Sequence, residues 1–222
     1  MSIKWQSEKN LIVQGVKQIT KLGLSLPTNG NVSIRLKEQG SPDLIAITPT
    51  RKNSLNLVED DITIINFDAE SLKEDQIPST ESLMHIAIYK IRPDINAVIH
   101  AHSTYASVAA ITGIEIPPVL DEMVISIGGT ISLSPYAFPG SEKLAQNISQ
   151  SLTDKNSALL QNHGAVAIGR NLAEAIDICV LTEKVAEIFI KALQVGKINE
   201  LPLEVVEAEK SIYRMQRQQR ST

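Results

Sequence analysis

Residues 97–102 read Ala-Val-Ile-His-Ala-His, and the rest of the chain can be interpreted outward from this stretch. Its apolar residues, with Ile95 before them, predict a buried strand. Successive side chains of a strand point to opposite faces, so His100 and His102 lie on one face with their Cα atoms roughly 6.6 Å apart. That spacing allows one metal ion to bind both imidazoles. A histidine at the end of an apolar strand is often only a core or rim residue, so the pair needs support from elsewhere.

Two distant segments supply that support. His163 lies in the sequence Gln-Asn-His-Gly of residues 161–164, and Glu81 ends the sequence Pro-Ser-Thr-Glu of residues 78–81. Three neutral imidazoles would leave a tetrahedral Zn²⁺ with one open position, which is the arrangement of catalytic rather than structural zinc sites. Without substrate, Glu81 could close that position itself. The sequence therefore predicts a metal site with His100, His102, His163 and Glu81.

The predicted site favours the removal of a proton from carbon. A cation that binds a carbonyl or hydroxyl oxygen makes the neighbouring C–H group more acidic, and Glu81 is the candidate base. The hydroxyl groups of Ser79 and Thr80, with the first N–H groups of the following helix, predict an anion site. A simpler interpretation is that Glu81 only complements the helix dipole, worth about 0.3–1 kcal/mol. His85, one turn later, is interpreted as a packing or hydrogen-bonding residue rather than as a ligand.

Composition narrows the class of protein. The 222 residues are 43% hydrophobic and 21% charged, which is ordinary for one globular α/β domain over residues 1–222. The net charge of −4 and the aromatic content of 4% argue against a nucleic-acid or anionic-membrane partner. Lys4, Glu8 and Lys9 interrupt the region where an export signal would be apolar, so a soluble cytoplasmic protein is expected. The single cysteine, Cys179, is predicted to be a core residue.

Hydrophobic periodicity and turn residues predict alternating helices and strands. Helices are expected at residues 10–22, 104–111, 141–152, 172–193 and 204–219, and strands at residues 32–36, 44–48, 62–67, 95–102, 124–133, 158–161 and 165–168. A further helix is expected to be capped by Ser79 or Thr80 and to end at Pro93, with Leu83, Ile86, Ala87 and Ile91 on its buried face. Gly128 and Gly129 predict a sharp bend in the strand at residues 124–133. The turn at residues 29–31 can be a simple bend, or Gly30 can let a ligand approach while Asn31 donates a hydrogen bond. The pattern predicts an α/β domain without fixing the sheet topology.

Five motifs in order resemble those of the class II aldolase and adducin head-domain family. They span nearly the whole chain, and together they are far more specific than any one of them. They are Gly30-Asn31-Val32-Ser33, Thr48-Pro49-Thr50, Pro78-Ser79-Thr80-Glu81, the segment from Arg92 to His102, and Leu160-Gln161-Asn162-His163-Gly164.

The resemblance implies a three-layer α/β/α fold with a largely antiparallel central sheet, and a homotetramer with active sites at subunit interfaces. It also implies zinc, or another divalent ion such as Mn²⁺ or Co²⁺, on His100, His102 and His163. Glu81 would be the acid/base. The residues implied to hold the substrate phosphate are Gly30, Asn31, Thr50, Ser79 and Thr80. The implied reaction is reversible cleavage of a ketose 1-phosphate, similar to L-fuculose 1-phosphate, to dihydroxyacetone phosphate and an aldehyde.

Two departures from the family pattern affect the expected specificity. Arg51 follows Thr50 where the aldolases commonly have glycine, which brings a cation to the phosphate pocket. Asp121 and Glu122 lie in a region where fuculose-phosphate aldolases supply a tyrosine to a neighbouring subunit. Tyr213, near the C-terminus, is a candidate substitute for that phenol.

Other activities of the same family remain open on the sequence. Ribulose-5-phosphate 4-epimerases generally have aspartate at the position of Glu81, which favours an aldolase here. Methylthioribulose-1-phosphate dehydratases and aldolases of 5-deoxypentose phosphates need the same metal-stabilised enediolate. A non-catalytic interaction domain similar to the adducin head is disfavoured because the three histidines and Glu81 are all present.

Overall fold

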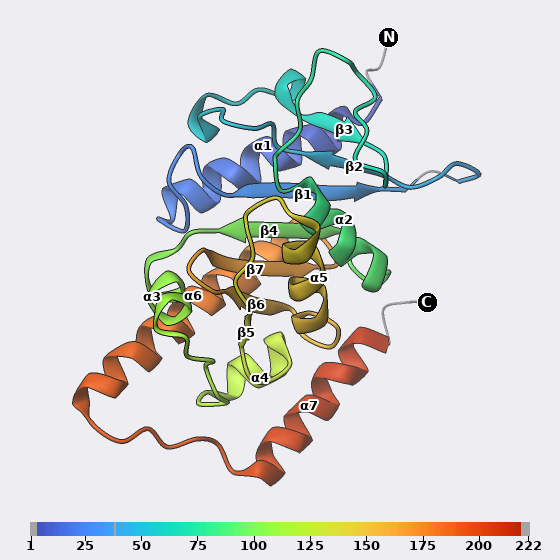
Figure 1. The fold of residues 1–222 in the computed structure, drawn as a ribbon. Helices are drawn as coiled ribbons and strands as arrows, with labels where there is room; N and C mark the ends of the chain where they lie inside the picture. The colour runs from blue at the N-terminus through green and yellow to red at the C-terminus, as the bar shows by residue number, and fades with distance from the viewer. Residues whose placement is uncertain (1–3, 38, 219–222) are drawn as a thin grey trace.

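The computed structural model describes residues 4–37 and 39–218, and its centre is a seven-stranded sheet of strand order β3-β2-β1-β4-β7-β6-β5 (Figure 1). The predicted single domain, residues 1–222, includes residues 1–3, 38 and 219–222, which lie outside the described part. The strands are β1 (Asn31–Leu36), β2 (Leu44–Ile47), β3 (Thr63–Ile65), β4 (Ala97–Ala101), β5 (Ser132–Ser134), β6 (Ser157–Leu160) and β7 (Gly164–Gly169).

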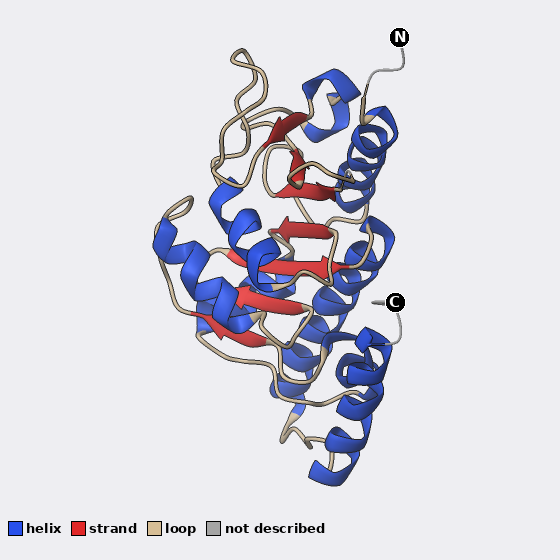
Figure 2. Cartoon of the chain, turned by 90° about the vertical axis from the view of Figure 1, so that its right-hand side faces the viewer, coloured by secondary structure: helices blue, strands red, loops and turns tan. Residues whose placement is uncertain are grey.

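Helices cover both faces of this sheet, as the edge-on view in Figure 2 shows. The α-helices are α1 (Gln6–Lys21), α2 (Ser82–Ile91), α3 (Thr104–Thr112), α4 (Asp121–Ile127), α5 (Glu142–Ser151), α6 (Leu172–Val195) and α7 (Leu203–Gln218). Two 3₁₀ helices, η1 (Ser54–Asn56) and η2 (Glu59–Asp61), lie between β2 and β3. Helices α2 and α5 pack together on one face, while α1, α3 and α6 contact the strands from the other.

The sheet is antiparallel at every junction between the named strands except β5 with β6, which run parallel. Together with the two helical layers, this pairing confirms the predicted three-layer fold with a largely antiparallel sheet. The register places Asn31 of β1 opposite His100 of β4, and His100 opposite Val166 of β7. The strand that carries two of the predicted ligands is therefore held between two neighbours in the middle of the sheet.

Side chains alternate between the two faces of β4, so one strand contributes to the hydrophobic core and also carries a residue of the predicted metal site. Ala97, Ile99 and Ala101 are buried in the core that lies under α1, α3 and α6. Val98 points to the opposite face, into the smaller core under α2 and α5, and His100 follows it on that face. Burial of apolar side chains on both faces stabilises β4 by roughly 25 cal/mol per Å² of apolar area. The imidazoles are thus fixed by a strand with little freedom to move.

Residues 124–133 do not form the predicted bent strand. Residues up to Ile127 belong to helix α4, and only Ser132–Ser134 pair as a strand. Gly128 has a φ of 104°, in the left-handed region that ends helices and that favours glycine. The apolar run was too short for periodicity to distinguish a helix from a strand.

Helix α2 begins later than predicted and buries another face. Its N-cap is Glu81 rather than Ser79 or Thr80, and the Glu81 side chain makes no capping hydrogen bond. Ile86 is buried as expected, but Leu83 and Ala87 are half-buried and Ile91 is exposed. The most deeply buried residues are instead Met84, His85, Ile88 and Tyr89. Two of these, His85 and Tyr89, are polar, and both form hydrogen bonds with Ser33 of β1.

None of the helices within the described residues combines the length and the hydropathy that a bilayer crossing requires.

Candidate active site

Three chain segments meet at one end of β4 and bring the four predicted residues together. His100 lies on β4 and His102 follows its last residue, while His163 comes from the turn between β6 and β7. Gly164 passes so close to β4 that a Cβ atom there would lie 2.4 Å from the carbonyl oxygen of Ala101. Only glycine permits this approach without a shift of the backbone. The short β6–β7 connection therefore places His163 next to His100 and His102.

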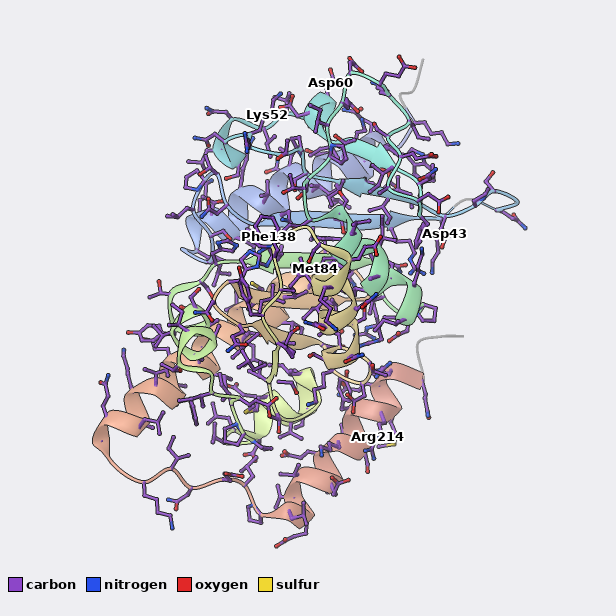
Figure 3. All side chains as sticks on the ribbon, in the orientation of Figure 1. Asp43, Lys52, Asp60, Met84, Phe138 and Arg214 are labelled. Atoms are coloured by element: carbon purple, nitrogen blue, oxygen red, sulfur yellow. The ribbon has the colours of Figure 1, made fainter. Side chains whose placement is uncertain are left out.

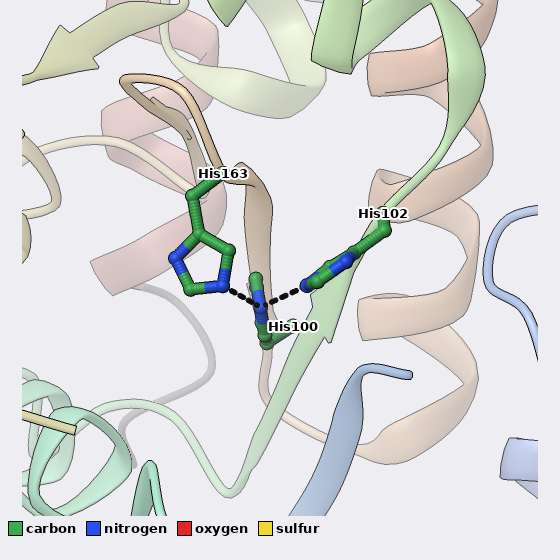
Figure 4. A group of neighbouring side chains, drawn as sticks. All are labelled: His100, His102 and His163. Atoms are coloured by element: carbon green, nitrogen blue, oxygen red, sulfur yellow. Dashed lines mark hydrogen bonds between the residues drawn. The ribbon is translucent and has the colours of Figure 1, made fainter. Parts of the chain in front are cut away.

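The imidazole nitrogens of the three histidines converge (Figure 4). His100 Nε2 lies 2.8 Å from His102 Nε2 and 3.3 Å from His163 Nε2. The carboxylate of Glu81 completes the group, because Oε2 lies 3.3 Å from His100 Nε2 and Oε1 lies 3.5 Å from His163 Nε2. A tetrahedral metal with bonds of about 2.0–2.1 Å separates its ligand atoms by about 3.3 Å. The donor set therefore fits a divalent ion.

The protonation of the histidines also suits a cation. His100 Nδ1 lies 3.0 Å from the carbonyl oxygen of Ala165, so Nδ1 carries the proton and Nε2 presents its lone pair to the other histidines. Burial, and secondarily the neighbouring histidines, lower the pKa values of His100 and His102 to about 3. Both rings are therefore neutral at pH 7, as metal binding requires.

Glu81 carries the least satisfied atom of the group. Its side chain is buried, and Oε2 accepts a hydrogen bond of 2.8 Å from Asn31 Nδ2. Among the described residues, Oε1 is buried without a hydrogen-bond partner. A buried acceptor left unpaired costs about 1–3 kcal/mol, and a cation or a substrate proton would satisfy it. This atom and the three Nε2 atoms together define the candidate reaction centre.

A cavity of about 290 Å³ opens beside this centre. All five residues predicted for substrate phosphate line it, as do Glu81 and two of the histidines. The predicted residues on its wall are Gly30, Asn31, Thr50, Ser79, Thr80, Glu81, His102 and His163. His100 lies behind them, fully buried. Arg51 and Lys52 also line the cavity, so positively charged groups border it together with the carboxylate of Glu81.

Three backbone N–H groups just before and at the start of α2 are hydrogen-bonded within the protein. Ser79 N donates to Thr48 O at 3.1 Å, Glu81 N to Ser79 Oγ at 3.2 Å, and Ser82 N to Ser79 O at 3.1 Å. These three N–H groups are therefore already engaged, and the anion site at this helix start stays a prediction. The hydroxyl groups that line the cavity remain available for an anion, because Ser79 Oγ only accepts in this turn.

Tyr213 is not near the cavity. It is buried under α4 and donates a hydrogen bond of 2.9 Å to Asn156 Oδ1. The suggestion that it supplies a catalytic phenol is wrong, because its hydroxyl group is engaged in the interior. Glu122 lies on the surface in an ion pair of 2.8 Å with Lys184, and Asp121 is exposed beside it at the start of α4.

The sequence did not reveal what surrounds Glu81. His85 and Tyr89 follow Glu81 at intervals of four residues on α2, and all three face Asn31 and Ser33, which alternate along β1. The matching periodicities of a helix and a strand could have indicated this contact. His85, which the sequence predicts to be a packing or hydrogen-bonding residue, has hydrogen bonds on both ring nitrogens.

The buried histidines predict that the metal-free protein loses stability in mild acid. Burial lowers the pKa values of His85, His100 and His102 to about 3, whereas an unfolded histidine titrates near 6.5. Between these values the unfolded chain binds more protons, so the free energy of unfolding falls as the pH drops below about 6.5. The expected slope is about 1.4 kcal/mol per pH unit for each histidine. Urea unfolding at pH 7.5, 6.5 and 5.5 after chelation measures it, and a flat profile would contradict the buried neutral state.

Comparisons with known proteins agree with this geometry. A profile described as "Class II Aldolase and Adducin N-terminal domain" matches residues 10–190. A 5-deoxy-D-ribulose 1-phosphate aldolase of Bacillus thuringiensis serovar kurstaki is 33% identical over 202 residues, which are 91% of this chain and 93% of that protein. An L-fuculose phosphate aldolase of Escherichia coli K12 is 32% identical over 184 residues, 83% of each chain. A solved L-fuculose 1-phosphate aldolase superposes with a TM-score of 0.88 at 30% identity, covering 96% of this chain and 98% of its own.

Proposed function

The chain belongs to the class II aldolase and adducin N-terminal domain family, and from this premise we propose that it is an aldolase of short ketose 1-phosphates. The proposed reaction is reversible cleavage to dihydroxyacetone phosphate and an aldehyde. The observation that carries the proposal is the unpaired Glu81 Oε1, which lies 3.5 Å from His163 Nε2 beside a cavity lined by hydroxyl groups and Arg51. A carboxylate in that position suits proton transfer to and from a carbon atom.

His100, His102 and His163 are the proposed ligands of a divalent metal, with Zn²⁺ as the first choice and Mn²⁺ or Co²⁺ as alternatives. The convergence of their Nε2 atoms within the spacing of a tetrahedral site supports this assignment. Glu81 would be a fourth ligand when substrate is absent. When bound, the cation would supply Lewis-acid stabilisation of the negative charge that develops on the substrate oxygens.

Glu81 is the proposed acid/base. Asn31 holds Oε2, so Oε1 is the atom that remains to accept a proton from the substrate carbon and to return it. Its burial excludes water from the carboxylate, which strengthens its electrostatic interactions with the reacting groups. General acid–base catalysis of this kind contributes typically about 10²–10⁴-fold to the rate.

The proposed phosphate pocket is the wall formed by Gly30, Asn31, Thr50, Ser79 and Thr80, together with Arg51. Gly30 has a φ of 75°, and a Cβ atom there would lie 2.6 Å from His100 O, so this residue also keeps the turn against β4. The hydroxyl groups and the guanidinium group would donate to phosphate oxygens, with Arg51 adding charge. The side chain of Asn31 is committed to Glu81, so we assign it mainly to the positioning of the base.

A homotetramer with the cavity at a subunit interface is also part of the proposal. The loop after β5 carries Tyr136 and Phe138, which are 57% and 75% exposed, and its Pro139 lines the cavity (Phe138 is labelled in Figure 3). Large exposed aromatic side chains are typical of protein interfaces. Light scattering coupled to size-exclusion chromatography tests this, and a monomer at micromolar concentration would overturn it.

The activity is tested with purified protein supplied with Zn²⁺ and a panel of sugar phosphates. The panel includes L-fuculose 1-phosphate, 5-deoxyribulose 1-phosphate, methylthioribulose 1-phosphate and ribulose 5-phosphate. Release of dihydroxyacetone phosphate is followed with a coupled reductase. Loss of water from methylthioribulose 1-phosphate would indicate a dehydratase, and interconversion of pentose phosphates an epimerase. Absence of dihydroxyacetone phosphate release from every ketose 1-phosphate would overturn the proposed function.

Replacement of Arg51 by glycine is expected to weaken substrate binding without weakening the fold. Arg51 has a φ of 55°, in the left-handed region, where a non-glycine residue is strained by roughly 1–2 kcal/mol. Relief of that strain offsets the greater freedom that glycine gives the unfolded chain. Loss of a charge-assisted contact should raise KM for the phosphorylated substrate about 10-fold, as a contact of about 1.5 kcal/mol implies. Steady-state kinetics and urea unfolding measure the two effects.

Lys52→Ala is the matched control for Arg51→Gly. Lys52 lines the same cavity, but it is paired with Asp61, so its removal should change KM much less. Equal values of KM for wild type and Arg51→Gly would show that Arg51 does not contact the phosphate.

A further inference from the structure

Behind Glu81, a chain of hydrogen bonds runs into the interior between α2 and β1. Asn31 joins Glu81 to His85, because its Nδ2 atom lies 2.8 Å from Glu81 Oε2 and its Oδ1 atom contacts His85 Nε2. His85 Nδ1 lies 2.7 Å from Ser33 Oγ, which in turn lies 2.9 Å from the hydroxyl oxygen of Tyr89. His85 is fully buried and does not line the cavity. Among the described residues, its hydrogen-bonded connection to the reaction centre runs through Asn31.

The chemistry of Glu81 determines which group donates and which accepts in every hydrogen bond of this series. An ionised carboxylate only accepts hydrogen bonds, so the NH₂ group of Asn31 must face Glu81 and its carbonyl oxygen must face His85. The opposite orientation would place two acceptors against each other. His85 Nε2 must then carry a proton and donate it to Asn31.

The donor and the acceptor of the hydrogen bonds that join His85, Ser33 and Tyr89 can be assigned in the same way. Burial, with a smaller contribution from His100, lowers the pKa of His85 to about 3, so its ring is neutral and carries one proton. Since that proton is on Nε2, Nδ1 is an acceptor and Ser33 Oγ–H donates to it. Ser33 Oγ accepts in turn from the Tyr89 hydroxyl group, which burial keeps protonated by raising its pKa.

We propose that His85 is a positioning residue that fixes the amide of Asn31 and thereby determines which oxygen of Glu81 takes part in proton transfer. With Asn31 bound to Oε2, the carboxylate cannot rotate freely, and Oε1 stays directed toward His163. Without the donor on His85, the Asn31 amide can rotate and release Oε2. The inference rests on the proposed function, since it concerns the base of that reaction.

Two substitutions at position 85 separate positioning from packing. In His85→Gln the side-chain amide can place an N–H group where Nε2 lies, so the bond to Asn31 can be kept. In His85→Asn the shorter amide can reach only the position of Nδ1, so the contact with Ser33 can be kept and the contact with Asn31 is lost. We expect His85→Gln to keep kcat within about threefold, and His85→Asn to lower it about 30-fold, because misplacement of a catalytic group by 1 Å can cost up to about 100-fold. KM and metal content should be unchanged in both.

A double-substitution cycle with Asn31→Ala tests whether His85 affects kcat through Asn31. If His85 acts through Asn31, His85→Asn should lower kcat no further in the Asn31→Ala background. A merely structural role would lower the free energy of unfolding in both variants and leave the kcat effects additive. Equal kcat values for His85→Gln and His85→Asn, or additive losses, would overturn the inference. A wild type without aldolase activity would instead overturn the proposed function.

A second measurement needs no enzymatic activity and reads the ring protonation in the wild-type protein itself. The chain has four histidines, so long-range ¹H–¹⁵N spectra of metal-free wild type can report the tautomer of each ring. The His85→Gln spectrum identifies the His85 signals by their absence. We expect the proton of His85 on Nε2, whereas that of His100 should be on Nδ1, where it donates to Ala165 O. A His85 ring protonated on Nδ1 would donate to Ser33 instead of Asn31, which would exclude the proposed role.

Discussion

Glu81→Gln is expected to lower kcat about 1,000-fold while KM and metal content stay close to wild type. General acid–base catalysis contributes typically about 10²–10⁴-fold, and the amide cannot accept and return a proton in the same way. Glutamine has nearly the same shape as glutamate, and its carbonyl oxygen can still accept the hydrogen bond from Asn31 Nδ2. The three histidines keep their geometry, so zinc should remain bound. Steady-state kinetics with the best substrate of the panel, and metal analysis of the purified variant, measure the two outcomes.

The control for this substitution is Glu204→Gln, which removes an exposed carboxylate in the first turn of α7. That variant should match wild type in kcat, KM and metal content. If Glu81→Gln kept more than about a tenth of the wild-type kcat, Glu81 would not be the base, since the minimum expected contribution is about 10²-fold. If it lost its metal, the carboxylate would be needed mainly as a ligand.

The local alternation of β4 was enough to predict that His100 and His102 share a face, because the side-chain period of a strand is fixed. The position of His163 could be inferred from chemistry and resemblance, but its approach depends on the β6–β7 turn. In that turn Asn162 has a φ of 57° and Gly164 lies against Ala101. Spacing along a strand is a local property, whereas convergence of a distant turn requires the register of the whole sheet.

Residues whose roles depend on tertiary contacts were harder to predict. His85 lies 54 positions from Asn31, and their contact depends on the way α2 packs across β1. Tyr213 was judged by its chemical type, yet α7 places its hydroxyl group against Asn156 in the interior. A sequence shows which side chains could do chemistry. Only the packing decides whether each of them faces a cavity or is satisfied inside the core.

His163→Ala is expected to abolish stable metal binding and to lower kcat by about 1,000-fold or more. Loss of one of three imidazoles removes a ligand from the cation, and its charge stabilisation is worth several kcal/mol of the activation barrier. His163 lines the open cavity, so water can fill the space left by the ring and the fold should lose less stability than if the buried His100 were removed. Chelation of wild type should have the same effect on kcat, but added Zn²⁺ should restore the wild type only. His85→Gln, which leaves the three ligands intact, is the matched control and should still bind about one ion per chain. Full activity of chelated wild type would show that the convergent Nε2 atoms do not hold a catalytic metal.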